Sequence, residues 1–138
     1  MKKVNILLGL LLLFCFTYGN QIDETTAKKV GQAFLSNRIN SETLKSTANL
    51  QVVYKANFKM SNTMASIQSV TFFYIFNASS NGFIIVAGDD NVTPILGYSD
   101  KGAFDPSNLP QNVAKWLEGY KNQIRYVIDN KILYLPVG

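Results

Sequence analysis

The sequence contains no histidine, and its single cysteine, Cys15, lies in an apolar stretch near the N-terminus. Without an imidazole, neither a Ser-His-Asp triad nor a Cys-His pair can form, because both use histidine to move the proton of the nucleophile. Zinc sites are also disfavoured, because they are built mainly from histidine and cysteine. We therefore expect a protein that is not an enzyme and that needs neither a cofactor nor a metal ion.

Acid–base chemistry with carboxylates is the remaining catalytic option, and the candidate for it is a pair of adjacent aspartates. Asp89 and Asp90 are followed by Asn91, and two neighbouring carboxylates can bind calcium or act as an acid and a base. The spacing of an EF-hand calcium loop is absent. Because residues 88–91 begin with glycine and lie between two apolar runs, we predict a plain turn here.

A strong net charge is lacking as well. The chain has 13 Lys and Arg against 9 Asp and Glu, a formal net charge of +4, and its basic residues form no run. Domains that bind nucleic acid usually gather such residues into a patch, so we predict no nucleic-acid partner. Aromatic residues make up 12% of the chain, which favours a packed sheet over disorder.

The N-terminus has the pattern of a secretory signal. Two lysines precede an apolar run over residues 6–16, and the small residues Thr17 and Gly19 suit cleavage before Asn20. The run is shorter than the roughly 20 apolar residues of a membrane-spanning helix. We therefore predict that residues 1–19 are a signal peptide that is removed.

Removal of this leader leaves one domain, residues 20–138, without a cysteine, so the apolar core alone must stabilise its fold. Cys15 keeps an alternative open, because a cysteine near the end of a leader can be the lipidation site of a bacterial lipoprotein. That processing prefers a small residue before the cysteine, whereas Phe14 stands there. We expect a secreted, periplasmic or cell-surface protein without a stable membrane span, monomeric when it has no partner.

Hydrophobic periodicity predicts a helix at the start of the domain, over residues 20–38. Asp23 is the expected N-cap, with an acidic residue in the first turn. The expected inner face consists of Ala27, Val30, Ala33, Phe34 and Asn37.

A second amphipathic helix is predicted over residues 109–130. Asn108 is its expected N-cap, with Pro110 in the first turn and Gln111 as the capping-box partner. Its apolar residues follow the i, i+3, i+4, i+7 spacing and are Val113, Trp116, Leu117, Tyr120, Ile124, Val127 and Ile128.

Four strands are expected between the helices. Two runs of β-branched and aromatic residues, 70–76 and 83–87, predict an antiparallel hairpin closed by Asn81 and Gly82. Further strands are expected at 50–58 and, after Pro94, at 95–98, with loops over 39–49 and 60–68. The order helix, four strands, helix predicts an α+β fold. We expect a mainly antiparallel four-stranded sheet flanked by the N-terminal and the C-terminal helix.

The hairpin region also resembles the pro-segment of streptopain-like cysteine proteases. The resemblance rests on an aromatic strand, a turn and Gly-Phe-Ile-Ile-Val-Ala-Gly-Asp over residues 74–90, then Pro-Ile-Leu-Gly-Tyr-Ser at 94–99 and Gly-Ala-Phe-Asp at 102–105. It covers residues 22–130 in outline and is tight over 72–105. The ordered series with matching gaps is more specific than any one motif.

This resemblance implies a pro-segment fold without its enzyme, because the protease domain and the catalytic cysteine and histidine of that family are missing. Such a protein is similar to inhibitors that reuse the pro-segment against a mature protease. In pro-forms of the family, the loop before the last helix enters the active-site cleft, where an asparagine displaces the catalytic histidine. The corresponding residues, taken as the inhibitory loop, are Pro106, Ser107, Asn108, Leu109, Pro110, Gln111 and Asn112.

Two questions remain open at this level. Asn112 precedes an apolar residue as the family asparagine does, but the stretch is about one residue longer here, so Asn108 is a rival. The function expected from the resemblance is that of a secreted inhibitor of a streptopain-like cysteine protease. Alternatives are a detached folding assistant of such a protease, or a surface or adhesion module without a protease partner.

Overall fold

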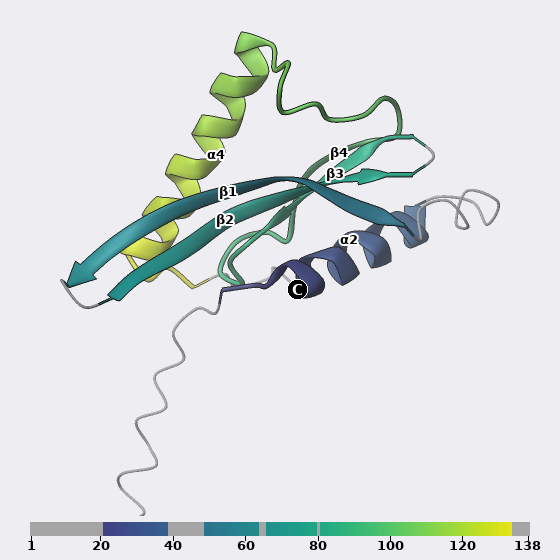
Figure 1. Ribbon diagram of the computed structural model, residues 1–138. Helices are drawn as coiled ribbons and strands as arrows, with labels where there is room; N and C mark the ends of the chain where they lie inside the picture. The colour runs from purple at the N-terminus through teal and green to yellow at the C-terminus, as the bar shows by residue number, and fades with distance from the viewer. Residues whose placement is uncertain (1–20, 39–48, 64–65, 80, 134–138) are drawn as a thin grey trace, which may run out of the picture.

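The computed structural model describes residues 21–38, 49–63, 66–79 and 81–133. Two helices enclose four strands in chain order, and the strands form one antiparallel sheet in the order β1-β2-β3-β4 (Figure 1). The α+β prediction, with a helix at each end of the chain's fold, is therefore confirmed. The elements are α2 (Glu24–Arg38), β1 (Leu50–Thr63), β2 (Ser66–Ala78), β3 (Phe83–Ala87), β4 (Ile95–Ser99) and α4 (Gln111–Asp129).

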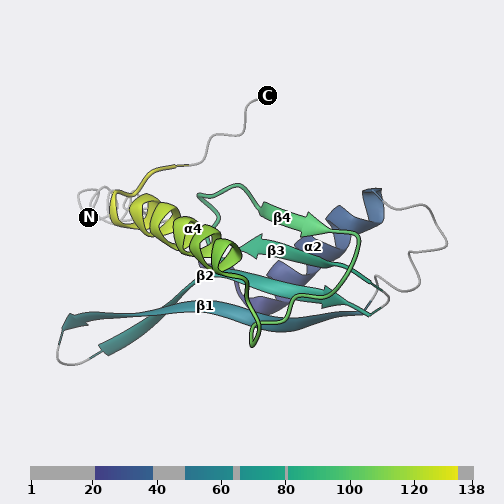
Figure 2. The same cartoon turned by 90° about the horizontal axis from the view of Figure 1, so that it is seen from above.

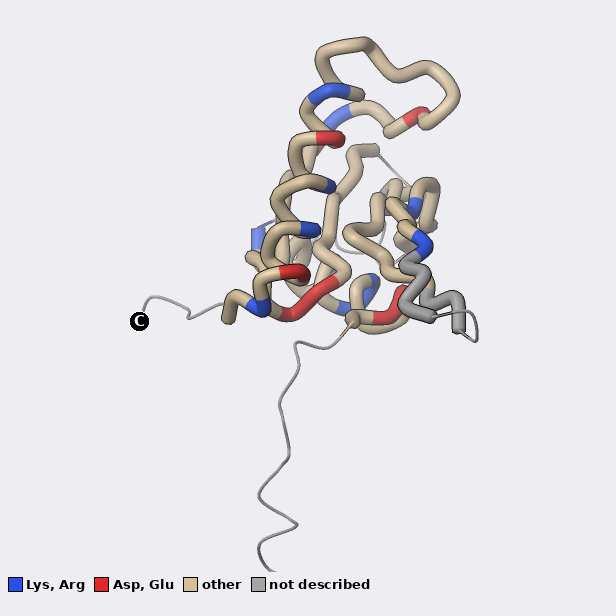
Figure 3. Tube along the Cα trace, turned by 90° about the vertical axis from the view of Figure 1, so that its left-hand side faces the viewer, with Lys and Arg blue, Asp and Glu red and all other residues tan. Residues whose placement is uncertain are grey.

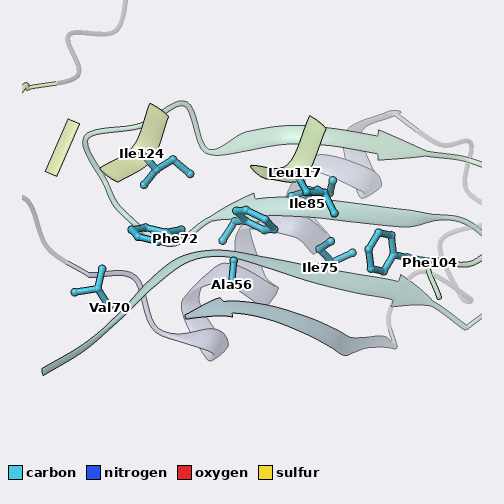
Figure 4. Close-up of a cluster of buried hydrophobic side chains, with 9 residues drawn as sticks. Ala56, Val70, Phe72, Ile75, Ile85, Phe104, Leu117 and Ile124 are labelled. Atoms are coloured by element: carbon cyan, nitrogen blue, oxygen red, sulfur yellow. The ribbon is translucent and has the colours of Figure 1, made fainter. Parts of the chain in front are cut away.

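The sheet lies between the two helices, with α2 on one face and α4 on the other (Figures 1 and 2). Each face has its own apolar cluster because strand side chains alternate between the two sides of a sheet. The cluster under α4 is drawn in Figure 4 and contains Ala56, Val70, Phe72, Phe73, Ile75, Ile85, Phe104, Leu117 and Ile124. The cluster under α2 contains Ala27, Leu35, Leu50, Tyr74, Phe76, Ile84 and Val86.

A bulge in β2 explains why two consecutive phenylalanines belong to the same cluster. Ala56 pairs with Phe73, but the next residue of β1 pairs with Thr71, so Phe72 is left without a partner in the register. Such an extra residue shifts the alternation by one position. Phe72 therefore faces α4 together with Phe73, and both are almost fully buried.

The predicted first helix starts too early. Gln21 forms a β-bridge with Asp89 instead of a helical turn, and its side-chain oxygen accepts a hydrogen bond from the amide of Thr71 at 2.8 Å. The helix begins at Glu24, and Asp23 is its N-cap as predicted, because the Thr26 amide donates to Asp23 Oδ1 at 2.6 Å. This backbone hydrogen bond lowers the pKa of Asp23.

The predicted inner face of this helix is wrong in two places. Ala33 and Asn37 are exposed, and the buried stripe is Ala27, Gly31 and Leu35, four residues apart. Gly31 was missed because glycine does not count as apolar in a periodicity. A Cβ there would lie only 3.2–3.4 Å from side chains of β1 and β3, so the glycine lets α2 lie close to the sheet.

The loop predicted over residues 60–68 is also wrong, because β1 and β2 continue as a paired ribbon to Thr63 and Ser66. The ribbon extends past the ends of β3 and β4 (Figure 1). Polar residues indicated a loop, but strand pairing uses backbone groups and tolerates them. At its base, the rings of Phe58 and Phe72 stack at 6.1 Å, and the Arg125 guanidinium of α4 lies 4.0 Å from the Phe58 ring centroid. The loop predicted over 39–49 falls mostly on residues 39–48, which are outside the described part.

The hairpin of β2 and β3 is confirmed, with Asn77 opposite Phe83. Its turn depends on Gly82, which has φ +96°, and a Cβ there would lie 2.3 Å from the carbonyl oxygen of Ser99. Strand β3 has the predicted bounds, and β4 ends one residue later than predicted. The last helix is two residues shorter at its start than predicted and one shorter at its end.

We expect Gly82→Ala to lower the free energy of unfolding far more than the matched variant Gly102→Ala. Both glycines have positive φ, which costs an alanine about 1–2 kcal/mol, but a Cβ at Gly102 meets no atom within 4 Å. Only Gly82→Ala adds a clash with the backbone of Ser99. Urea unfolding of both variants measures the difference. Equal losses of unfolding free energy would contradict the prediction and show that the backbone near Gly82 can shift to relieve the clash.

Candidate functional site

The predicted inhibitory residues lie where the chain passes from β4 to α4. In Figure 1 this green segment leaves the sheet beyond β4 and reaches the start of α4. Six of the seven residues over 106–112 are exposed, and Leu109 is half-buried against the cluster under α4. The stretch 106–112 carries no charged residue, and the loop is almost entirely tan in Figure 3. A partner would therefore be recognised here by shape and hydrogen bonds.

Phe104 anchors the beginning of this loop. Its side chain is buried, with ring centroids 5.8 Å from Phe83 and 6.1 Å from Tyr54. Asn77, near the end of β2, holds the backbone of the same residue with two hydrogen bonds. The Phe104 amide donates to Asn77 Oδ1 at 2.8 Å, and Asn77 Nδ2 donates to the Phe104 carbonyl at 3.0 Å. The loop therefore starts from a fixed point on the sheet.

A tight turn follows the anchor. Asp105 Oδ1 accepts a hydrogen bond from the Ser107 amide at 2.9 Å, and the Asp105 carbonyl accepts one from the Asn108 amide at 3.3 Å. A side chain that binds the backbone two residues on is a common way to fix a turn. Leu109 then returns to the core. The exposed tip is thus Pro106, Ser107 and Asn108, fixed on both sides.

The N-cap prediction for the last helix is wrong. The N-cap is Pro110, in an extended conformation with φ −57° and ψ 143°, and no side chain caps the helix. Asn108 lies too far before the first turn to act as cap, since it belongs to the turn that starts at Asp105. Gln111 is therefore no capping-box partner but the first helical residue.

The two candidate asparagines occupy different settings. Asn108 belongs to the exposed tip, whereas Asn112 is an exposed residue in the first turn of α4. An asparagine amide can donate and accept hydrogen bonds at once, so either can bind a polar group of a partner. The helix fixes the backbone of Asn112, which lowers the entropy that its side chain loses on binding.

Asn77 and Phe104 fix the start of the loop, and the sequence analysis did not assign them to this site. In the sequence, Asn77 follows the apolar run 70–76 and begins a polar segment, and Phe104 belongs to the motif at 102–105. The position of Asn77 at the end of an aromatic strand was the only available signal. Their meeting across 27 residues could not be predicted from local patterns.

The acidic pair of the sequence forms the predicted turn. Asp89 is 4% exposed, and its Oδ1 accepts a hydrogen bond from the Asn91 amide at 2.9 Å. In the described part of the chain, no group of three or more acidic, histidine or cysteine residues is placed to bind a metal ion. Within the same residues, no helix is long and apolar enough to cross a membrane.

Comparison with known proteins places the chain in a family. The model of the Spi protease inhibitor family matches residues 19–124. The thiol protease/hemagglutinin PrtT of Porphyromonas gingivalis is 33% identical over 135 residues, which is 95% of this chain and 14% of that protein. Streptopain of Streptococcus pyogenes is 46% identical over 60 residues, 44% of this chain and 14% of streptopain. The chain thus spans about one seventh of the length of these relatives.

The family match includes all of the sheet, the loop with Asn77 and Phe104 at its start, and the first turns of α4. It also agrees with the resemblance to streptopain-like proteases that the motifs over 74–105 indicated. The chain belongs to the Spi protease inhibitor family.

Proposed function

We propose that this protein is a secreted inhibitor of a streptopain-like cysteine protease and that it acts by placing residues 106–112 in the active-site cleft. The observation that carries the proposal is the loop itself, which is exposed and uncharged and is fixed by Asn77 at one end and α4 at the other. A loop held in one conformation loses little entropy on docking, which favours tight binding.

The proposed mechanism is displacement of the catalytic histidine of the target. A cysteine protease needs this imidazole beside the thiol, because the base converts the thiol into the nucleophilic thiolate. An asparagine amide that takes the place of the imidazole, or binds it in a rotated position, would leave the thiol unactivated. Asn112 is our first candidate for this contact, and Asn108 is the second.

The proposal includes export of the protein. Residues 1–19 would be removed as a signal peptide, and residues 20–138 would act outside the cytoplasm as a monomer. If Cys15 were lipidated instead, the protein would remain attached to a membrane surface and could still present the loop. Intact mass of the exported protein distinguishes the two routes.

The test is a titration of mature streptopain and of a streptopain-like protease from the same organism with the purified protein, alongside papain as a control. We expect dose-dependent loss of activity of a streptopain-like enzyme and no effect on papain. Absence of inhibition at micromolar concentrations would contradict the proposal for these partners. A faster recovery of denatured protease in its presence would then favour a folding assistant, and neither effect would favour a surface module.

A further inference from the structure

The flank of α4 that faces β4 presents an exposed aromatic residue beside the proposed loop. Trp116 is the only tryptophan of the chain and is 46% exposed. It lies four residues after Asn112, and Gly119 lies three residues further on. Residues spaced in this way follow one side of a helix, so Asn112, Trp116 and Gly119 form a single stripe that begins where the loop ends.

The Trp116 ring is held in place although it is exposed. Gly97 of β4 leaves room for it, since a Cβ at Gly97 would lie 3.1 Å from Trp116 Cη2. The indole also packs against the Tyr120 ring in a T-shaped arrangement with the centroids 4.8 Å apart, and the Tyr120 hydroxyl donates to the Leu96 carbonyl at 2.8 Å. An aromatic surface that is already ordered binds a partner at a small entropic cost.

Gly119 has no reason to be glycine within this chain. It lies inside α4, where glycine is less favourable than alanine, and a Cβ there would meet no atom within 4 Å. Glycine on an open helix surface permits the close approach of another backbone. The missing side chain therefore leaves space next to Trp116 on the outer surface.

A groove continues the same flank. It has a volume of about 300 Å³ and lies between α4 and the segment that leads into β4, with Leu96, Tyr120 and Gln123 among its lining residues. Its walls are mainly apolar, so it suits apolar side chains. The groove lies along the second half of α4, and Tyr120, which lines it, contacts Trp116, so the loop, the stripe and the groove follow one another along this flank.

We infer that the Trp116–Gly119 stripe is a second contact of this inhibitor with the protease domain, in which Trp116 packs on an apolar patch at the rim of the active-site cleft. This inference rests on the proposed function. Asn112 is shared by the loop and the stripe, so a protease that takes up the loop must lie against this side of α4. Continuity with the loop favours the protease over a second copy of the chain as the occupant.

Three variants test the inference by inhibition constants against the protease that the unmodified protein inhibits. Trp116→Ala should weaken inhibition at least about tenfold, because tryptophans that become buried in an interface are frequent hot spots. Gly119→Ala should also weaken it while raising the urea midpoint, a combination that a purely structural role would not give. Tyr98→Ala is the matched control and should change little, because Tyr98 is 45% exposed, almost as much as Trp116, but packs against Phe34 of α2 on the other face of the sheet.

A direct readout uses 5-fluorotryptophan at position 116, which gives one ¹⁹F signal. We expect this signal to shift when the mature protease, with its thiol blocked, is added. An unchanged signal and an unchanged inhibition constant for Trp116→Ala, with inhibition by the unmodified protein intact, would overturn this inference and leave the proposed function standing. Failure of the unmodified protein to inhibit would overturn both.

Discussion

Replacing Asn77 by alanine should lower the free energy of unfolding by about 2–4 kcal/mol. The change removes both hydrogen bonds to Phe104 and leaves an amide and a carbonyl of a buried residue without partners, at about 1–3 kcal/mol for each such group. It also frees the start of the loop over residues 106–112, so the inhibition that we propose should weaken about tenfold or more. Urea unfolding and the inhibition constant measure the two effects separately.

Asn77→Asp is the graded control for this prediction. A carboxylate can still accept the hydrogen bond from the Phe104 amide but has no donor for the Phe104 carbonyl. Its losses in stability and inhibition should therefore lie between those of the unmodified protein and Asn77→Ala. If Asn77→Ala changed neither quantity, burial of the Phe104 ring alone would hold the loop.

Asn112→Ala should weaken inhibition about 30-fold or more, the effect of a hot-spot contact worth about 2 kcal/mol. Its stability should stay nearly unchanged, because Asn112 is exposed and no side chain caps α4. The inhibition constant is the measurement, with urea unfolding as the check on folding.

Two further asparagines give this experiment its controls. Asn122→Ala removes an exposed amide of the same helix, ten residues further from the loop, and should leave inhibition unchanged. Asn108→Ala, at the loop tip, should have a smaller effect than Asn112→Ala. The reverse order would assign the displacement of histidine to Asn108, and no effect of either would contradict the proposed mechanism.

Local patterns predicted those parts of the fold whose signals are local. The hairpin of β2 and β3 follows from two β-rich runs around a polar turn, and the capping of α2 follows from Asp23. Part of the inner face of α4 was predicted from apolar residues that repeat at helical spacing. Leu117 and Ile124 belong to that set, and both are buried. The position of the loop between β4 and α4 was likewise available from the sequence.

Features that depend on contacts between distant segments could not be predicted. Gly31 lies on the buried side of α2 only because the sheet comes close to it there. The base of the ribbon is held at Phe58 by Arg125, which lies 67 residues further along the chain. The hydrogen bonds between Asn77 and Phe104 also join distant segments, and they fix the start of the exposed loop.

Each strand of the sheet lies beside its neighbour along the chain. Bringing such neighbours together closes short loops, which costs little entropy, and domains that mix helices and strands fold at rates between those of helical bundles and all-β domains. Folding of the four strands does not wait for a distant part of the polypeptide. If the chain is exported unfolded, as we propose, the loop would take its conformation soon after export and before any contact with the proposed protease.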